Sequence, residues 1–276
     1  MSIIQIYKGN NLIEGKRGKK VIAFDLDETL GSFSDLYYLW LGTIKYCEEN
    51  GEIYDATDVF NRLMNIYPEF LRPGIKKIMT FIYKKKLSKE CAKVFLYTNN
   101  QAHGLDNSKW LSLIINYFND LMGSSKPILF DKIISAFKIN NKIIEPMRTT
   151  HDKTYSDFIQ CAMLPKTTEI CFIDNTYYEN MLNNRVYFIV PSSYNHNLKQ
   201  SEIIKRYSFN QVPKEFMCTW LKNNRGGSNS LYKNELLVSQ KIMYHIKEFF
   251  LSGKKNNKTK KIPMRIGRFT RRKRKH

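Results

Sequence analysis

The sequence predicts an α/β protein in which helices cover both faces of a Rossmann-like parallel sheet. Short, bare apolar runs predict buried strands at VIAF (21–24), VFLY (94–97), EICFI (169–173) and VYFIV (186–190). Amphipathic helical patterns separate these runs, and such alternation is typical of a sheet buried on both faces. Hydrophobic residues make up 42% of the chain and aromatic residues 13%, which is enough for a large core.

The first half of the chain combines these strands with three predicted helices. Residues 1–20 predict an edge hairpin that leads into the first strand. Between Ser32 and about Phe70, apolar and aromatic residues recur at helical spacing, which predicts two helices. LRPG (71–74) interrupts the pattern, and the IKKIMTFIYKKK that follows predicts an amphipathic helix.

The second half continues the alternation of helices and strands. We expect a helix over 108–122 and short strands and turns from 126 to about 147. TYSDFIQCAM (154–163) predicts a helix that begins with a capping-box-like pair, Thr154 and Asp157. The composition of 221–230 is that of a linker, and a last amphipathic helix is predicted over 231–252.

Positive charge is concentrated at the C-terminus. Residues 253–276 contain twelve Lys and Arg and no Asp or Glu, which leaves +8 of the net +20 for the rest of the chain. We expect a disordered basic tail that binds nucleic acid or another polyanion non-specifically, or serves as a nuclear address. A solubilising tail without a defined partner is the alternative.

Several classes of protein are disfavoured. The sequence contains no run of about 18 apolar residues, so it predicts no membrane-spanning helix. MSIIQIYKGN lacks the features of a signal peptide. The five cysteines are scattered and form no CxxC, which favours a reducing, intracellular compartment without disulfides or a thiolate metal site.

Polar clusters follow three of the predicted strands. Asp25 and Asp27 follow the first, Thr98-Asn99-Asn100 follows the second, and Asp174-Asn175 follows the third. Ligands of parallel sheets bind beyond the carboxyl ends of the strands. With Lys153, these groups supply oxygens for Mg²⁺, donors for phosphate oxygens and one positive charge. The inventory suits phosphoryl transfer.

These four motifs resemble those of the haloacid dehalogenase (HAD) superfamily. DLDETL, the threonine of YTNN, the lysine of HDKTYSDF and the aspartate of FIDNTYYEN match them in order over about residues 19–200. DLDETL, RPG and Asp-Asn are most similar to the FCP/SCP (NLI-interacting-factor-like) phosphatase branch. The Asn-, Ile- and Lys-rich composition with its RRKRK ending also resembles proteins of large DNA viruses or AT-rich protists.

The resemblance implies a Mg²⁺-dependent phosphomonoester hydrolase that acts through an aspartyl-phosphate, on phosphoprotein in that branch. Asp25 is then the nucleophile, and Asp27 is the general acid and base. Thr98 and Lys153 bind the transferring phosphoryl group, and Asn99 belongs to the same substrate-binding set.

The metal site that the resemblance implies draws on the same cluster. Asp25, Asp27, Asp174 and Asn175 are its expected ligands, directly or through water. Lys132, Lys138 and Lys142 compete with Lys153 for the role of the phosphate-binding lysine, and the start of a helix favours Lys153. The metal could also be Mn²⁺.

Two insertions depart from the branch pattern. Within a catalytic domain over 1–220, residues 32–70 predict a small helical cap and residues 101–150 a second insertion. Caps select substrates, so a small molecule, a phosphoprotein and a polynucleotide end all remain candidates, as does a catalytically idle HAD-like scaffold that binds nucleic acid through its tail.

Six other residues near the site have two interpretations each. Thr29 either packs against the turn or takes part in catalysis. His103 and His151 are isolated histidines, and an isolated histidine is more often a polar residue with satisfied hydrogen bonds than a catalytic one. Tyr37 and Tyr38, with Trp40, are expected to belong to the core of the cap in preference to a platform on which a substrate stacks.

Overall fold

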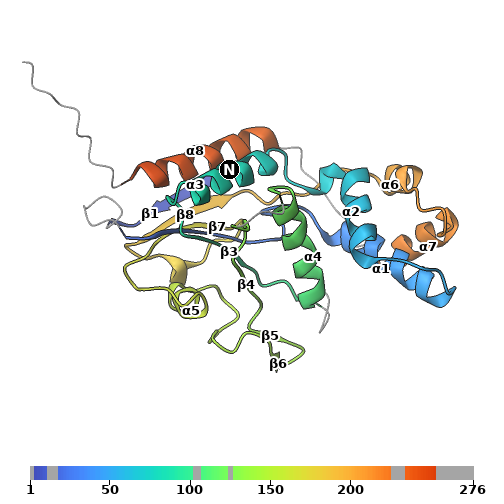
Figure 1. Cartoon of the computed structure of the whole chain (residues 1–276), viewed down its shortest axis with the longest axis horizontal. Coiled ribbons are helices and arrows are strands. Elements are labelled where there is room, and N and C mark those ends of the chain that lie inside the picture. Colours follow the sequence, from blue (N-terminus) through green and yellow to red (C-terminus); the bar gives the residue numbers. More distant parts are fainter. Residues whose placement is uncertain (1–2, 11–17, 102–106, 124–126, 225–233, 253–276) are drawn as a thin grey trace, which may run out of the picture.

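The computed structural model describes residues 3–10, 18–101, 107–123, 127–224 and 234–252. Its centre is a six-stranded sheet with the strand order β1-β8-β7-β2-β3-β4, in which every pairing except that of β1 is parallel. The predicted α/β class with a mostly parallel, Rossmann-like sheet is therefore confirmed (Figure 1). The strands are β1 (Ile4–Lys8), β2 (Lys20–Phe24), β3 (Lys93–Tyr97), β4 (Lys132–Ile134), β7 (Glu169–Ile173) and β8 (Val186–Pro191).

The N-terminal residues form an edge strand, and residues 11–17, where the second arm of the predicted hairpin would lie, are outside the described residues. β1 pairs antiparallel with β8, from Ile4 opposite Pro191 to Lys8 opposite Tyr187, and not with β2. β2 instead lies in the middle of the sheet between β7 and β3. Its four residues from Val21 to Phe24 are fully buried, which explains why this strand is bare of polar side chains.

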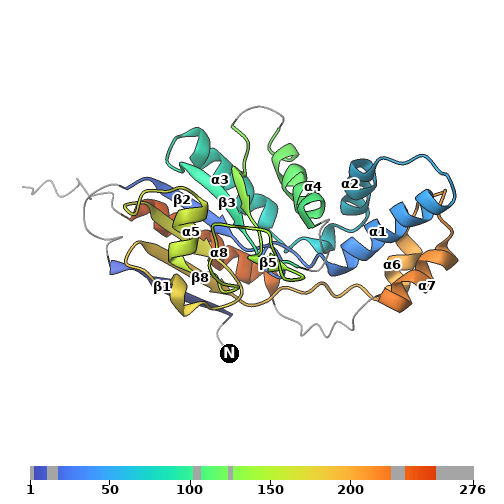
Figure 2. The same cartoon turned by 90° about the horizontal axis from the view of Figure 1, so that it is seen from below.

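Helices cover both faces of the sheet, as Figures 1 and 2 show. α3 (Ile75–Leu87) and α8 (Glu235–Leu251) lie together on one face, and α8 contacts both β8 and β1. α5 (Tyr155–Cys161) covers the other face, where Phe158 packs edge-on against Phe95 of β3. α4 (Asn107–Asp120) packs into the same core as α3 through Trp110 and its neighbours.

A group of helices gathers at one end of the sheet (Figures 1 and 2). Two segments far apart in the chain build it. The first holds α1 (Ser34–Glu49), α2 (Ala56–Ile66) and the short 3-10 helix η2 (Pro68–Phe70), and the second holds α6 (Gln200–Arg206) and α7 (Lys214–Asn224). The two helices predicted over 32–70 are present, whereas α6 and α7 were not predicted.

The two segments are joined by buried polar contacts. The hydroxyl groups of Thr43 and Tyr207 lie 2.7 Å apart, and the Tyr67 hydroxyl donates to the carbonyl of Ile203 at 2.7 Å. Gly42 permits close packing of α1 on α7, because a Cβ at this position would lie 2.6 Å from the ring of Trp220. The helices of both segments therefore form one packed unit.

The linker predicted over 221–230 begins inside α7, which continues to Asn224 because Leu221 is fully buried in the core. The basic tail over 253–276 and most of that linker lie outside the described residues. In the second insertion, β5 (Lys138–Ile139) and β6 (Lys142–Ile143) pair as a small hairpin, in agreement with the short strands predicted there. Within the described ranges, no helix has the length and apolar character needed to cross a membrane.

Candidate active site

The carboxyl ends of the two central strands bring Asp25 and Asp174 together. Phe24 of β2 pairs with Ile173 of β7, so the residues that follow each strand leave the sheet side by side. The Lys153 ammonium lies between both carboxylates, with Nζ 2.5 Å from Oδ1 of Asp25 and 2.6 Å from Oδ2 of Asp174. All three side chains are buried. Three of the predicted site residues therefore form one charged cluster.

Burial and charge act in opposite directions in this cluster. Burial alone would lower the pKa of Lys153, but Asp174 and Asp25 raise it above its ordinary value. Burial raises the pKa of Asp174 to about 7, although Lys153 lowers it in part and Asp25 raises it further. The lysine therefore stays charged and holds the two carboxylates in place.

The local fold selects Lys153 among the four candidate lysines. It directly precedes Thr154, the N-cap of α5, whose Oγ1 accepts a hydrogen bond from the backbone N–H of Asp157 at 3.0 Å. Lys132 instead donates to the carbonyl of Cys161. Lys138 and Lys142 belong to the β5–β6 hairpin. Of these four lysines, Lys153 is the one that contacts the aspartates.

Asp27 lies two residues after Asp25 in the first motif and has a different environment. Its Oδ2 accepts a hydrogen bond from Nδ2 of Asn100 at 2.6 Å. Burial, and next the Asp25 carboxylate, raise the pKa of Asp27 to about 7, while the hydrogen bond from Asn100 lowers it in part. A carboxyl group that titrates near neutral pH suits proton transfer in either direction.

Thr98 and Asn99 lie at the end of β3, beside the charged cluster. The buried Thr98 Oγ1 accepts the backbone N–H of Asn100 at 3.0 Å, and Nδ2 of Asn99 donates to the Tyr178 hydroxyl at 3.3 Å. The Lys153 ammonium lies 5.7 Å from the centre of the Tyr178 ring. Tyr178 therefore lies between the second motif and the lysine.

Thr29 and Asn175 bind each other. Thr29 Oγ1 donates to Oδ1 of Asn175 at 2.8 Å and accepts the Asn175 backbone N–H at 3.0 Å. Nδ2 of Asn175 donates to Ser193 Oγ at 3.0 Å and to a carboxylate oxygen of Glu28 at 3.3 Å. The structure thus gives Thr29 a turn-stabilising role, and the Asn175 side chain joins the first motif to the loop after β8.

Arg72, in the LRPG segment, is only 1% exposed and binds backbone carbonyls of the first motif. Its Nε donates to the carbonyl of Thr29 at 2.8 Å, and its Nη2 donates to the carbonyls of Glu28 and of Ser192. Glu28 has a φ of 59°, a left-handed conformation that few residues other than glycine adopt. The guanidinium therefore stabilises a strained turn directly after Asp27.

Arg148, which the sequence did not mark, links the second motif to the third. It is 2% exposed, and its Nη2 donates to Oδ1 of Asn99 at 2.7 Å and to the carbonyls of His151 and Asp152 at 3.0 and 3.1 Å. Asp152 directly precedes Lys153. Nothing in the sequence distinguishes this arginine from the other arginines of the chain. His151 stacks edge-on against Phe137, whereas His103 lies outside the described residues.

The donor set fits a magnesium ion. Three carboxylates, those of Asp25, Asp27 and Asp174, share the single ammonium of Lys153, so the ionised cluster carries excess negative charge. Mg²⁺ is usually held by one or two carboxylates, with waters and substrate oxygens completing the shell. Among the described residues, no group of three or more Asp, Glu, His or Cys side chains is placed to hold a metal ion. This absence is compatible with a Mg²⁺ site that uses only one or two protein carboxylates.

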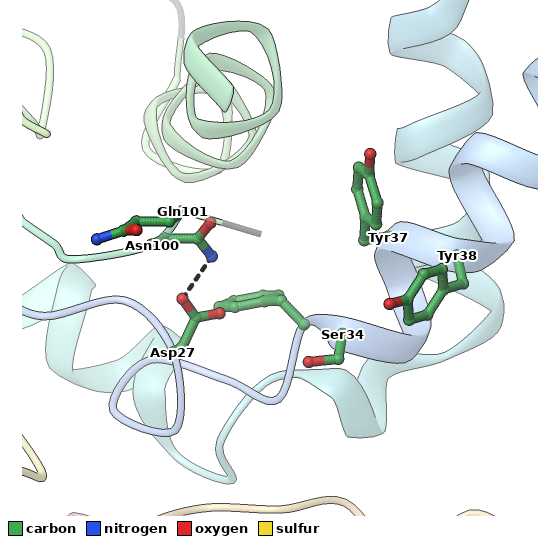
Figure 3. Close-up of a pocket in the computed structure, with 7 residues that line it drawn as sticks. Asp27, Ser34, Tyr37, Tyr38, Asn100 and Gln101 are labelled. Atoms are coloured by element: carbon green, nitrogen blue, oxygen red, sulfur yellow. Dashed lines mark hydrogen bonds between the residues drawn. The ribbon is translucent and has the colours of Figure 1, made fainter. Parts of the chain in front are cut away.

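A pocket of about 210 Å³ opens beside Asp27. Figure 3 shows Asp27 and Asn100 on one side and Tyr37 and Tyr38, from the first turns of α1, on the other. Trp40 is 6% exposed and belongs to the core as predicted, whereas Tyr37 and Tyr38 are only partly buried. The complete lining is Asp27, Phe33, Ser34, Tyr37, Tyr38, Asn100 and Gln101.

Comparison with known proteins gives no family assignment. No protein-family model matches the chain, and no curated protein matches it significantly. What the site does is therefore inferred from its own side chains.

Proposed function

We propose that the protein is a Mg²⁺-dependent phosphomonoester hydrolase of the HAD type that acts through an aspartyl-phosphate. The observation that carries this proposal is the Lys153 ammonium within 2.6 Å of carboxylates that follow two neighbouring parallel strands. A site of this kind binds a dianionic phosphoryl group through a fixed positive charge while it orients a carboxylate for attack. The order of the four motifs along the chain supports the same assignment.

The first half-reaction transfers the phosphoryl group to the protein. A carboxylate oxygen of Asp25 forms a bond to phosphorus as the bond from phosphorus to the ester oxygen breaks. Asp27 in its protonated form gives its proton to that departing oxygen, so the product leaves as a neutral alcohol. The raised pKa of Asp27 keeps a useful fraction of this carboxyl protonated at neutral pH.

The second half-reaction returns the protein to its starting state. Asp27, now a carboxylate, takes a proton from water, and the water oxygen bonds to phosphorus as the Asp25–phosphorus bond breaks. Inorganic phosphate leaves, and Asp27 has regained its proton. One residue thus acts first as acid and then as base, which its pKa near 7 permits.

The neighbouring groups bind and position the phosphoryl group. Thr98 Oγ1 accepts a backbone N–H, so its own hydrogen is free to donate to a phosphoryl oxygen. Lys153 neutralises a second oxygen and fixes the rotamer of Asp25. Asn99 is oriented by Arg148 and Tyr178 for the same role.

Mg²⁺ would be held by the carboxylates of Asp25 and Asp174, with Asp27 beside them. Bound there, it supplies positive charge against the phosphoryl oxygens and the excess negative charge of the cluster. In this proposal the Asn175 side chain does not bind Mg²⁺ directly, because its Oδ1 already accepts a hydrogen bond from the hydroxyl of Thr29.

The helical unit of α1, α2, α6 and α7 serves as the cap in this proposal. Three of the pocket residues, Ser34, Tyr37 and Tyr38, belong to α1, and Phe33 directly precedes this helix. The cap therefore stands where the alcohol part of a substrate leaves. The five free cysteines, four of them buried, suit the reducing intracellular compartment that we propose for the protein.

The test is hydrolysis of a generic aryl phosphate with and without Mg²⁺, for the wild type and Asp25→Asn. We expect metal-dependent turnover that the substitution reduces by at least about a thousandfold, since it removes the nucleophile. Circular dichroism of both proteins controls for folding. Turnover that is unchanged in Asp25→Asn would overturn the mechanism.

A polynucleotide-end phosphatase is the second candidate, favoured by the twelve basic residues of 253–276. Removal of this tail would then weaken activity on phosphorylated oligonucleotides steeply at low salt and leave activity on aryl phosphates intact. A catalytically idle scaffold that binds nucleic acid through its tail is distinguished from both, because no phosphate ester would be hydrolysed and Asp25→Asn would change nothing.

A further inference from the structure

We infer that the natural substrate is the phosphomonoester of an uncharged alcohol that carries a planar ring, and that this ring binds in the pocket formed by α1 and Asp27. The inference rests on the proposed function, which it extends from the reaction to the class of substrate. The evidence is the position, the chemistry and the size of the pocket.

The position of the pocket assigns it to the leaving group. Asp27 is both a lining residue and the proposed proton donor to the departing oxygen. The phosphoryl group binds on the side of Lys153, Asp25 and Asp174. An alcohol whose oxygen faces Asp27 must therefore extend toward the opposite wall, where Figure 3 shows Tyr37 and Tyr38.

The chemistry of the lining selects a neutral ring. Phe33, Tyr37 and Tyr38 supply three aromatic side chains, and aromatic pockets favour planar groups through stacked or edge-on contacts. The other lining residues apart from Asp27 are uncharged and can bind polar substituents of a ring through hydrogen bonds: Ser34, Asn100 and Gln101. No Lys or Arg is among the described residues that line the pocket, so these residues offer no counter-charge to a second phosphate.

The size of the pocket limits the ring. Its volume of about 210 Å³ is below the range of about 300–1,000 Å³ that is usual for sites of drug-sized ligands. A single aromatic ring, or one ring with an attached sugar, is the scale that fits.

Tyr37 and Tyr38, which line one side of the pocket, contact tryptophan residues outside it. The Tyr37 ring lies 5.2 Å from that of the buried Trp110 and 6.1 Å from that of Trp40, between ring centres. The carbonyl of Tyr38 accepts a hydrogen bond from Nε1 of Trp220 in α7 at 2.9 Å. The ring contacts hold the Tyr37 side chain in place, and the Tyr38 ring packs edge-on against it at 5.6 Å between ring centres, which reduces the cost of ordering both tyrosines when a ring binds.

The test compares two phosphate esters whose leaving alcohols have similar acidity, benzyl phosphate and propyl phosphate, with uridine 5′-monophosphate as a third substrate. We expect the wild type to prefer the ring-bearing esters over propyl phosphate by about tenfold or more in kcat/KM. The ratio of kcat/KM for benzyl phosphate to kcat/KM for uridine 5′-monophosphate then distinguishes the ester of a simple ring-bearing alcohol from a nucleoside monophosphate.

Substitutions of Tyr38 test whether the preference for ring-bearing esters arises in the pocket. Tyr38→Ala should lower kcat/KM for benzyl phosphate much more than kcat/KM for propyl phosphate and so remove most of the preference for a ring, and Tyr38→Phe should retain the preference. The matched control is Tyr244→Ala, because Tyr244 is 63% exposed on α8 outside the pocket. Equal turnover of all three esters, or a preference that survives in Tyr38→Ala, overturns the inference.

Binding separates failure of the inference from failure of the proposed function. Calorimetry with the non-hydrolysable benzylphosphonate and propylphosphonate measures recognition of the ring without chemistry. If no ester is hydrolysed but benzylphosphonate binds about tenfold more tightly, and only when Tyr38 is present, the ring pocket stands and the proposed hydrolase does not. If the esters are hydrolysed and the two phosphonates bind equally, the hydrolase stands and the ring pocket is overturned.

Discussion

Arg72 pairs with Glu235 at 2.7 Å and thereby connects the turn after Asp27 to the first residue of α8. The guanidinium is buried, and its other donors reach the carbonyls of Glu28, Thr29 and Ser192. One side chain therefore joins the first motif, the loop after β8 and the C-terminal helix. Burial lowers the pKa of Arg72 to about 10, and Glu235 raises it in part, so the group stays charged at neutral pH.

Replacement of this side chain should loosen the turn that carries Asp27. Arg72→Lys cannot reach three carbonyls and a carboxylate in one plane, so we expect the free energy of unfolding to fall by about 1–3 kcal/mol and turnover to fall with it. Denaturant titration and ester hydrolysis measure the two effects. Glu235→Gln is the control, since it weakens a single contact and should have the smaller effect on both. Wild-type turnover in folded Arg72→Lys would contradict this role.

The raised pKa values of Asp27 and Asp174 predict how stability depends on pH. A carboxyl group whose pKa rises on folding binds its proton more tightly in the folded state. The stability that this provides is therefore complete below the unfolded pKa of about 4 and is lost as pH rises through about 7. We expect the metal-free protein to lose about 1–3 kcal/mol of unfolding free energy between pH 5 and pH 8.

Denaturant unfolding at the two pH values, in the presence of a chelator, measures this loss. Asp27→Asn removes one of the two groups and should flatten the dependence. Asp58→Asn is a suitable control, because this residue lies at the start of α2, away from the cluster. Identical slopes in the wild type and Asp27→Asn would show that Asp27 titrates at its ordinary pKa.

Mg²⁺ should offset the same excess of negative charge. At pH 8 we expect saturating Mg²⁺ to raise the unfolding free energy of the wild type by about 1–3 kcal/mol, as any ligand specific to the folded state does. Asp174→Asn removes a proposed ligand and should abolish most of this gain. The readout is thermal unfolding and needs no substrate. A gain that is unchanged in Asp174→Asn would place the metal elsewhere.

The sequence predicted the charged cluster because few local signals were needed. Asp25 and Asp174 directly follow apolar strands, and the ends of neighbouring parallel strands must meet. Lys153 precedes a recognisable N-cap, so its place at the start of a helix was also visible. Chain order and strand ends thus suffice for residues that project directly from the sheet.

The residues that the sequence missed act over long separations. Arg72 was noted only as part of a chain break and of the RPG resemblance, and Arg148 was not noted at all, because their main partners are backbone carbonyls that no side-chain pattern encodes. The short helices α6 and α7 gain their stability from packing on α1, through contacts such as those of Tyr207 and Trp220. Such tertiary contacts are invisible to periodicity in a single segment.

Arg148 gives the sharpest test of how the second and third motifs are aligned. Its guanidinium contacts Asn99 on one side and the two residues before Lys153 on the other, so it sets the distance between two phosphate-binding groups. We expect Arg148→Met to lower the unfolding free energy by about 2–3 kcal/mol, because buried carbonyls lose their donors. Turnover should fall about tenfold or more, since small displacements of catalytic groups are costly.

A role in stability alone would affect turnover only as far as the protein unfolds. Turnover is therefore measured at a temperature where Arg148→Met is fully folded by circular dichroism. Arg62→Met, at an exposed arginine of α2, controls for loss of a positive charge. If folded Arg148→Met hydrolyses esters at the wild-type rate, alignment of the two motifs does not depend on Arg148. If its rate falls while Arg62→Met keeps the full rate, the buried guanidinium positions Asn99 and Lys153 for the reaction.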